Sequence, residues 1–265
     1  MTELAIAFAG GLLIGSFLNV CIFRLPNDLS VVKPRSYCPR CEQQIAWYDN
    51  IPVLSFVLLG GRCRTCRERI PWRYPIVELL TGALFAAAAA MHGCTAAGAK
   101  TAVFAAIMVT LIFSDIEERI LPDEFTLGGA VAGLGLAWIV PMEPGIVSAL
   151  LASQLSPRMV SLAESLAGAL FTGGALWAVG FLYQKIRHRE GLGLGDVKMI
   201  ITIGAFLGLH QTLFTLIIGS VAGAVLGLGY ILVARKDAST YELPYGSFLG
   251  AAALANVFLL PLWAR

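Results

Sequence analysis

The sequence predicts an all-α polytopic membrane protein with about eight transmembrane helices. Of its 265 residues, 57% are hydrophobic and only 14% are charged, and this composition is too apolar for a soluble domain of that size. The apolar residues gather into stretches, several of them shorter than the ~20 residues that a helix needs to cross a bilayer, so helix ends must borrow flanking residues. The eight stretches are residues 4–22, 74–91, 101–113, 125–140, 162–183, 197–209, 213–233 and 245–260.

The distribution of Lys and Arg predicts the orientation of these helices. If the amino terminus lies outside, sixteen of the nineteen basic residues lie on the cytoplasmic side, nine of them from Arg24 to Arg73. Such an excess is typical of cytoplasmic loops. The first stretch has neither a basic leader nor a small-residue cleavage site, so we expect a retained helix and not a signal peptide. Both termini are then outside.

The chain divides into three predicted parts: a first transmembrane helix (residues 1–23), a cytoplasmic loop (24–73) and a seven-helix core (74–265). The loop contains two Cys-x-x-Cys pairs separated by twenty-one residues. Four thiolates in such pairs suit a tetrahedral zinc ion, which would supply folding energy to a loop with little core. Disulfides or unrelated thiols are the alternatives, and a cytoplasmic location argues against disulfides. We expect Zn²⁺ to be bound by Cys38, Cys41, Cys63 and Cys66.

Two aspartates are candidates for catalysis. Asp115 follows the apolar stretch 101–113, and Asp196 follows the alternate glycines Gly191, Gly193 and Gly195. Alternate glycines permit positive φ and close approach, which predicts an irregular turn that delivers Asp196 to the first turn of a helix. The predicted topology places both acids at the cytoplasmic edge of the membrane, and ionisable residues at membrane depth are candidates for functional sites.

Two neighbouring carboxyl groups share a proton, so that one activates water and the other protonates a carbonyl or a leaving amine. This is the arrangement of aspartic proteases, although the sequence does not tell which aspartate holds the proton. Other acids in the same turn lie farther from the apolar stretch, and Asp123 is the next candidate among them. Lys198 lies about 200° around a helix from Asp196, so we expect it to contact lipid head groups.

Asn19 and Glu78 are isolated polar residues within apolar stretches. Asn19 fits either an interhelical hydrogen bond or the binding of a substrate or cofactor. Glu78 fits structural pairing with a basic residue as well as it fits a catalytic or cofactor-binding role.

Several ordered motifs resemble those of the bacterial type IV prepilin peptidases, which are membrane aspartic peptidases with a GxGD motif. Residues Gly193 to Asp196 match that motif, and the segment from Asp115 to Asp123 looks like the family's Asp…Pro-Asp segment. The resemblance covers nearly the whole chain. Further matching segments are Gly15 to Val20, Arg24 to Pro26, Pro34 to Cys41, Trp47 to Ser55, Cys63 to Cys66 and Arg73 to Glu78.

The resemblance implies two activities. The first is a peptidase that cuts the leader from type IV prepilins or type II secretion pseudopilins at the cytoplasmic face of the bacterial inner membrane. Asp115 and Asp196 would be its catalytic pair, within a membrane aspartic peptidase core at 74–265. The second is an N-methyltransferase that uses S-adenosylmethionine and is associated with the tetracysteine loop. Membrane lipid surrounds such a protein, and no nucleic-acid partner is expected.

The methyl-donor site is harder to predict from the residues. No strand followed by Gly-x-Gly-x-x-Gly is present, so a Rossmann-type site is not expected. The donor would bind between the cytoplasmic loop and the helices, and the candidate lining residues are Asn19, Arg24, Arg73 and Glu78.

One position departs from the family's pattern. The family usually has a second proline after the glycine that precedes the last apolar stretch, and Ser247 stands there in this chain. We expect this serine to lie away from both aspartates and therefore to affect local loop geometry more than activity.

Two other functions fit parts of the sequence. A transporter or channel would bind cations with its aspartates at broken helices, but it predicts acids near the middle of the membrane. A scaffold for pilus assembly would leave the aspartate pair unexplained.

Overall fold

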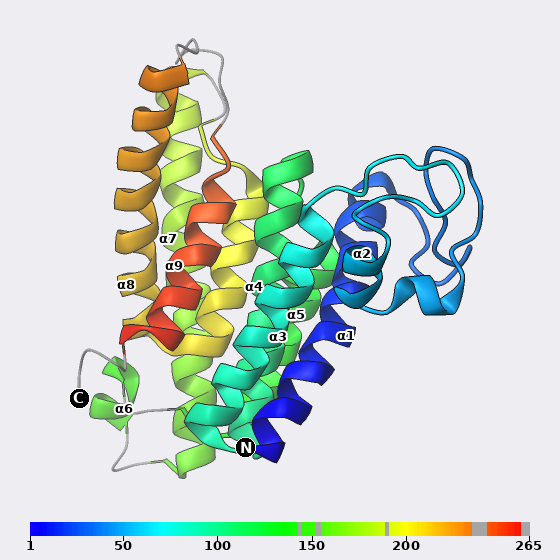
Figure 1. The fold of residues 1–265 in the computed structure, drawn as a ribbon. Coiled ribbons are helices and arrows are strands. Elements are labelled where there is room, and N and C mark those ends of the chain that lie inside the picture. Colours follow the sequence, from blue (N-terminus) through cyan, green and yellow to red (C-terminus); the bar gives the residue numbers. More distant parts are fainter. Residues whose placement is uncertain (143–144, 152–154, 189–190, 235–242, 261–265) are drawn as a thin grey trace. The chain divides into compact units, whose positions relative to one another are not determined.

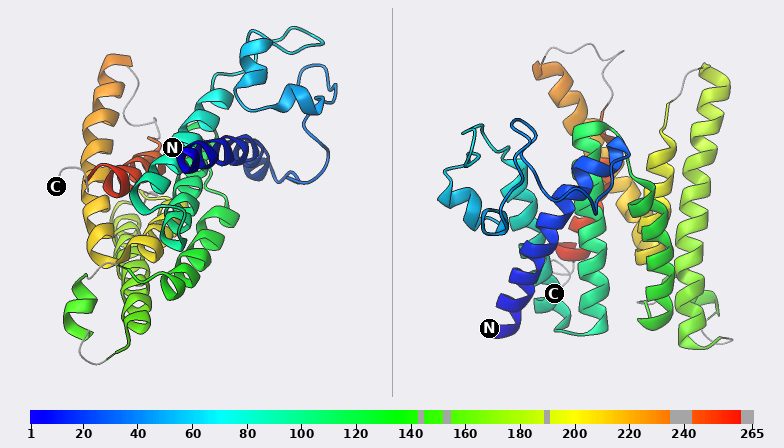
Figure 2. Two further views of the ribbon diagram at one scale, coloured as in Figure 1. Left: turned by 60° about the horizontal axis from the view of Figure 1, so that its bottom comes forward. Right: turned by 90° about the vertical axis from the view of Figure 1, so that its right-hand side faces the viewer.

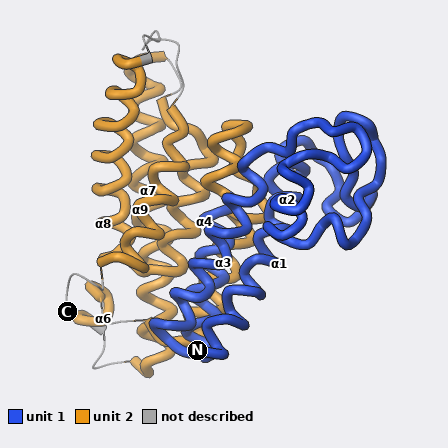
Figure 3. Tube along the Cα trace, viewed as in Figure 1, with its two compact units in different colours: residues 1–110 blue, residues 111–265 orange. Residues whose placement is uncertain are grey.

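The computed structural model describes residues 1–142, 145–151, 155–188, 191–234 and 243–260. Within these residues every regular element is a helix, and the extended pairing is confined to two isolated β-bridges. The prediction of an all-α fold is therefore confirmed. The chain forms two compact units, residues 1–110 and 111–265, which are coloured separately in Figure 3.

Unit 1 is built on two helices that pack closely against each other. Gly11 of α1 lies against Gly82 of α3, and Gly15 lies against Glu78, so that a Cβ on either of these α1 glycines would be within 3 Å of the α3 backbone. A later residue of α1 thus lies against an earlier residue of α3, so the two helices are antiparallel. The segment between them, in light blue, projects from their ends (Figure 1 and Figure 2). The elements are α1 (Thr2–Arg24), η1 (Leu25–Asn27), η2 (Trp47–Asn50), α2 (Leu54–Leu58), α3 (Arg73–His92) and the first part of α4 (Ala96–Glu118).

Unit 2 contains the end of α4 and five further helices. Its longest helix, α8, is interrupted at Gly208, whose φ of 76° and ψ of 179° are not helical. Glycine adopts such a φ without steric cost. The chain turns at this residue, so the yellow and orange parts of α8 run as two separate rods (Figure 1) and correspond to the predicted stretches 197–209 and 213–233. The helices are α5 (Asp123–Ile139), α6 (Ile146–Leu151), α7 (Pro157–Arg187), α8 (Leu194–Ala234) and α9 (Tyr245–Phe258).

A buried carboxylate connects three of these helices. Glu164 of α7 is 3% exposed. Its Oε2 accepts hydrogen bonds from the N–H groups of Val147 (2.9 Å) and Ser148 (3.1 Å), and its Oε1 accepts one from the N–H of Leu209 (3.2 Å). The first N–H groups of a helix have no partner within the helix. Glu164 therefore satisfies the start of α6 and the backbone immediately after the break at Gly208.

Five helices of the described residues are long and apolar enough to cross a membrane, namely 2–27, 73–92, 96–118, 157–187 and 194–233. The protein is accordingly a multi-pass membrane protein. The count of eight spans stays a prediction, because α5 has 17 residues and α9 has 14, both below the ~20 needed for a full crossing.

Candidate active site and metal centre

Asp115 lies in the last turn of α4 and is 6% exposed. Its Oδ2 accepts two hydrogen bonds from Ser247, one from the backbone N–H at 2.6 Å and one from Oγ at 2.8 Å. Ser247 belongs to the first turn of α9, whose N-cap residue Pro244 makes no side-chain capping bond. A carboxylate from another helix thus takes the place of the usual N-cap side chain.

Asp196 is the third residue of α8 and is half-buried. Its N–H donates to the carbonyl of Gly193 at 3.2 Å, which closes the turn that the sequence predicts. The preceding glycines Gly191, Gly193 and Gly195 do not use the positive φ that glycine permits. Two of them permit close approach instead. The Tyr183 ring packs where a side chain of residue 191 would lie, and a Cβ on Gly195 would be 3.2 Å from Leu121.

The two aspartates meet at Gly246, the residue before Ser247. A Cβ on Gly246 would lie 3.2 Å from Oδ2 of Asp115 and 3.2 Å from Oδ1 of Asp196. These two oxygens are therefore at most twice that distance apart, and the backbone between them carries no side chain. A water molecule hydrogen-bonded to both carboxyl groups would fit a separation of this size. Three segments that are distant in the sequence, at the end of α4 and the starts of α8 and α9, form this site.

Ser247 thus differs from the sequence-based expectation. It does not lie away from both aspartates, because α9 folds back over 132 residues of sequence to bring its N–H and hydroxyl onto Asp115. A proline at this position could donate neither hydrogen bond. The only available signal in the sequence was a hydroxyl residue next to a glycine at the start of an apolar stretch.

Asp123, which the sequence analysis named as the next catalytic candidate, has another partner. Asp123 begins α5, and its two carboxylate oxygens lie 2.7 and 3.0 Å from Nζ of Lys198. Lys198 therefore forms an ion pair in place of the expected contact with lipid head groups. One turn further along both helices, the Thr202 hydroxyl donates to the carbonyl of Thr126. These contacts fix the register of α5 against the first part of α8, on which Asp196 lies.

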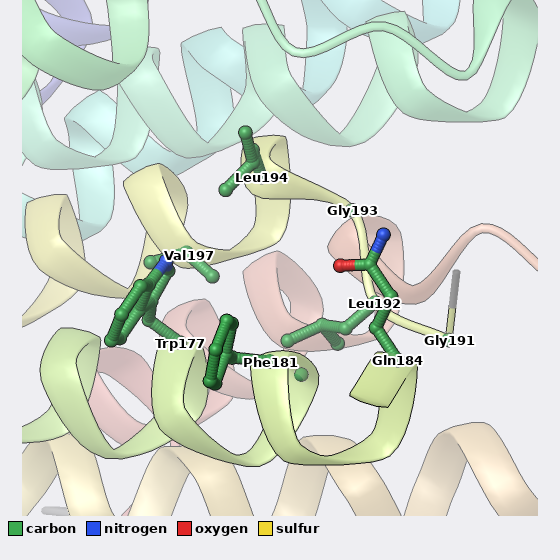
Figure 4. Close-up of a pocket in the computed structure, with 9 residues that line it drawn as sticks. Trp177, Phe181, Gln184, Gly191, Leu192, Gly193, Leu194 and Val197 are labelled. Carbon is green, nitrogen blue, oxygen red and sulfur yellow. The ribbon is translucent and has the colours of Figure 1, made fainter. Parts of the chain in front are cut away.

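A pocket of about 390 Å³ borders the loop that precedes Asp196. Figure 4 shows α7 on one side of this pocket, with the Trp177 and Phe181 rings, and the loop and the start of α8 on the other. The two rings stack with their centroids 5.4 Å apart. Gly191 and Gly193 are exposed along the loop, so backbone groups as well as apolar side chains are available to a ligand there.

The four cysteines of the loop in unit 1 come together. Their Sγ atoms all lie within 4.8 Å of one another, and those of Cys38 and Cys66 are 3.8 Å apart. Zn–S bonds of about 2.3 Å in a tetrahedron require sulfur atoms about 3.8 Å apart. None of these four cysteines forms a disulfide. The cluster therefore fits a tetrahedral metal ion bound by Cys38, Cys41, Cys63 and Cys66.

Each Cys-x-x-Cys pair closes the same kind of turn. The first cysteine of each pair, Cys38 or Cys63, donates its N–H to a carbonyl five residues later, at 3.0 and 2.8 Å. The residue after the second cysteine, Glu42 or Arg67, has a positive φ of 56° or 60°. In the second pair, a hydrogen bond from the backbone N–H of Cys66 lowers the pKa of the Cys63 thiol to about 7. The lower pKa favours the thiolate, which is the form that binds a metal ion.

The remaining predicted site residues also lie in unit 1. Asn19 donates from Nδ2 to the carbonyl of Tyr74 at 3.0 Å, and Arg73 lies over the Tyr74 ring at 4.6 Å. The Oδ1 atom of Asn19 is buried without a hydrogen-bond partner among the described residues. The interhelical role predicted for the Asn19 amide is thus present, and its acceptor oxygen has no partner among the described residues.

Glu78 lies one turn beyond Tyr74 on α3 and is 7% exposed. Its carboxylate accepts the N–H of Val53 at 2.7 Å and a side-chain hydrogen bond from Ser16 of α1, so neither of these partners is a basic side chain. Val53 has a φ of 61°, which is strained for a β-branched residue. Arg24 contacts a different part of the loop, where it donates to the carbonyl of Ser30 at 2.8 Å.

Comparison with known proteins gives consistent matches along the chain. A family model described as "Bacterial Peptidase A24 N-terminal domain" matches residues 10–92, and one described as "Type IV leader peptidase family" matches residues 102–228. A Myxococcus xanthus protein named "Prepilin leader peptidase/N-methyltransferase" is 36% identical over 97% of this chain and 74% of its own length.

Two further relatives agree. An Aeromonas hydrophila protein of the same name is 34% identical over 94% of this chain and 88% of its own length. The Escherichia coli O78:H11 "Type 4 prepilin-like proteins leader peptide-processing enzyme" is 31% identical over 97% and 94%. No solved structure matches the chain significantly.

Proposed function

This chain is a member of the type IV leader peptidase family, and we propose that it removes the leader peptide from prepilins and then methylates the new amino terminus. The observation that carries the peptidase proposal is the meeting of Asp115 and Asp196 at Gly246. Gly246 places no side chain between the two acids, so that both can act on the same peptide carbonyl and water molecule. The Myxococcus xanthus and Aeromonas hydrophila relatives carry both activities in their names, which supports the assignment of both to this chain.

In the proposed mechanism, Asp115 and Asp196 share one proton. The ionised carboxylate takes a proton from a water molecule as its oxygen bonds to the scissile carbonyl carbon, while the protonated carboxyl donates its proton to the carbonyl oxygen. The C–N bond then breaks as the carboxyl that took the water proton passes it to the leaving amine, while the other, now ionised, carboxylate takes a proton from a hydroxyl of the intermediate. Each aspartate serves once as acid and once as base, so the pair returns to its starting state.

The loop before Asp196 is the proposed docking place of the substrate. A peptide must be extended before it can be cut, and an extended strand needs backbone partners. The exposed Gly191 and Gly193 offer such partners without side chains, and the pocket beside them is walled by apolar residues. This arrangement supports the binding of the segment around the cleavage site.

The methyltransferase activity is proposed to reside in unit 1. S-adenosylmethionine supplies the methyl group that the new amine receives. Asn19 and Glu78 are proposed to bind the donor's polar groups, since Asn19 Oδ1 is a buried acceptor without a partner and Glu78 is a buried carboxylate. Arg24 and Arg73 are the proposed partners of its carboxylate. The four cysteines are proposed to bind Zn²⁺, which would hold the loop in shape.

The proposed location is the bacterial inner membrane, with the amino terminus outside and the aspartates at the cytoplasmic side. The concentration of basic residues in the loop 24–73 supports this orientation. In this arrangement residues 1–23 are the first span, 24–73 the zinc loop and 74–265 the peptidase core. The proposed substrates are type IV prepilins and type II secretion pseudopilins.

The test uses the full chain purified in detergent with a prepilin substrate, with leader removal and amino-terminal methylation measured by mass spectrometry. We expect Asp115→Asn and Asp196→Asn each to lower the rate of cleavage by at least ~10³-fold. When two catalytic groups act as a unit, removing either one costs about as much rate as removing both. Both variants should still methylate a pilin supplied without its leader. Glu124→Gln removes an exposed acid nearby and is the matched control. Wild-type cleavage by either asparagine variant would contradict the proposed pair.

A further inference from the structure

We propose that Ser247 is a positioning residue that holds Asp115 for leader cleavage and remains hydrogen-bonded to it in both protonation states of the carboxyl group. This inference rests on the proposed peptidase function and deepens it. It concerns a residue at which this chain departs from the pattern of the family it resembles.

Two donors of Ser247 converge on one carboxylate oxygen. The backbone N–H lies 2.6 Å and the hydroxyl Oγ 2.8 Å from Oδ2 of Asp115. Both residues are buried, Ser247 at 8% and Asp115 at 6% exposure. A buried carboxylate without donors is costly, and two donors at fixed angles also determine how the carboxyl plane is turned. Ser247 therefore sets the orientation of Asp115.

The position of the N–H donor follows from the start of a helix. Ser247 is the third residue of α9, and within its own segment its N–H makes only a long bond of 3.2 Å to the carbonyl of Pro244, because N–H groups in the first turn lack the usual helical acceptor four residues earlier. This donor is therefore available to another element, and the helix holds it rigidly. Asp115 at the end of α4 takes it, which ties the site to the packing of α9.

The hydroxyl adds an adjustable donor. Its single hydrogen has two acceptors within reach, Oδ2 of Asp115 at 2.8 Å and the backbone carbonyl of Ile112 at 3.1 Å. When Asp115 is ionised, the hydroxyl donates to Oδ2. When Asp115 carries a proton on Oδ2, that proton is donated to Oγ, and the hydroxyl hydrogen turns to Ile112.

A hydroxyl that can reverse its hydrogen bond suits a carboxyl that alternates between acid and base. Leaving a buried polar group unpaired in one of the two states would penalise that state. Ser247 avoids this penalty during the exchange of protons between Asp115 and Asp196. Alanine at 247 would keep the N–H but lose the adjustable donor, and proline would lose both donors.

The experiment measures kcat and KM for leader removal in the full chain with Ser247→Ala, Ser247→Thr and Ser247→Pro. A hydrogen bond to a charged group corresponds to a roughly ten- to hundredfold effect, so we expect kcat to fall by that factor in the alanine variant while KM is unchanged. Threonine should restore kcat, because it supplies the same hydroxyl and N–H. Proline should lower kcat at least as far as alanine.

A matched control separates positioning from folding. Ser165→Ala removes another buried serine hydroxyl of unit 2. This hydroxyl donates to the carbonyl of Ala205 at 2.6 Å and does not contact the aspartates. The variant should keep the wild-type kcat. Methylation of a pilin without its leader should be normal in every variant. Wild-type kcat in Ser247→Ala, or an equal loss of kcat in Ser165→Ala or Ser247→Thr, would overturn the inference. Asp115→Asn, assayed in parallel, reports on the peptidase proposal independently.

Discussion

Replacing Gly246 by alanine tests the meeting point of the two aspartates directly. The new Cβ would lie 3.2 Å from Asp115 Oδ2, Asp196 Oδ1 and Leu121 Cδ1. Optimal separations for such contacts are about 3.5–4.0 Å, so the neighbours must move by a few tenths of an ångström. Gly246 does not have a positive φ, so alanine can adopt its backbone conformation. The perturbation is therefore confined to the site.

The expected effect is larger on catalysis than on stability. Mild overpacking costs about 1–3 kcal/mol of unfolding free energy, whereas a displacement of about 1 Å in a catalytic group can lower the rate roughly hundredfold. The methyl group also takes up space in which a water molecule could hydrogen-bond both carboxyl groups. We expect the kcat/KM of Gly246→Ala for leader removal to fall by about a hundredfold.

The assay is leader removal in detergent, with thermal unfolding recorded for the same samples. Gly135→Ala in α5 is the matched control, because a Cβ there would meet nothing within 4 Å, and it should keep both activity and melting temperature. If Gly246→Ala cleaves like the wild type, the two aspartates do not work across this residue. A loss of cleavage that only parallels unfolding would also refute the reasoning.

Two other predictions concern the metal and the buried acid. Chelation, or Cys38→Ser, should remove about one zinc ion per chain, measured by elemental analysis, and should abolish methylation while leader removal continues; equal loss of both activities would contradict it. Glu164→Gln cannot accept all three backbone N–H groups, so the unfolding free energy should fall by about 1–3 kcal/mol. Thermal unfolding measures this, with Glu124→Gln as the exposed control, and an unchanged melting temperature would be inconsistent with the proposed role of Glu164.

The apolar stretches could be predicted because each is a local property of the sequence. All eight fall mainly within observed helices, and even the separation of 197–209 from 213–233 corresponds to the break at Gly208. The cysteine cluster was also predictable, since two Cys-x-x-Cys pairs fix most of a tetrahedral site by local turns. The two aspartates could be singled out because acids at the ends of apolar stretches are rare.

The partners of these acids could not be predicted in the same way. Ser247 reaches Asp115 across 132 residues, and Asp123 reaches Lys198 across 75. Such contacts depend on how helices pack, which helical periodicity alone does not determine. Glu164 was different, because a lone acid in the stretch 162–183 carries the same signal as Asp115. Only the structure shows that its hydrogen bonds are structural, since all of its observed partners are backbone N–H groups.

The construction of the site also explains how one of its residues can depart from the family pattern. The match to the leader peptidase family covers residues 102–228, which include Asp115 and Asp196 but not α9. The helix that completes the site, with Gly246 between the acids and Ser247 on Asp115, lies beyond that match. The proposed reaction requires two carboxyl groups, whereas α9 must supply only a backbone without a side chain and a means of orienting Asp115. A serine that donates twice meets the second requirement by hydrogen bonding.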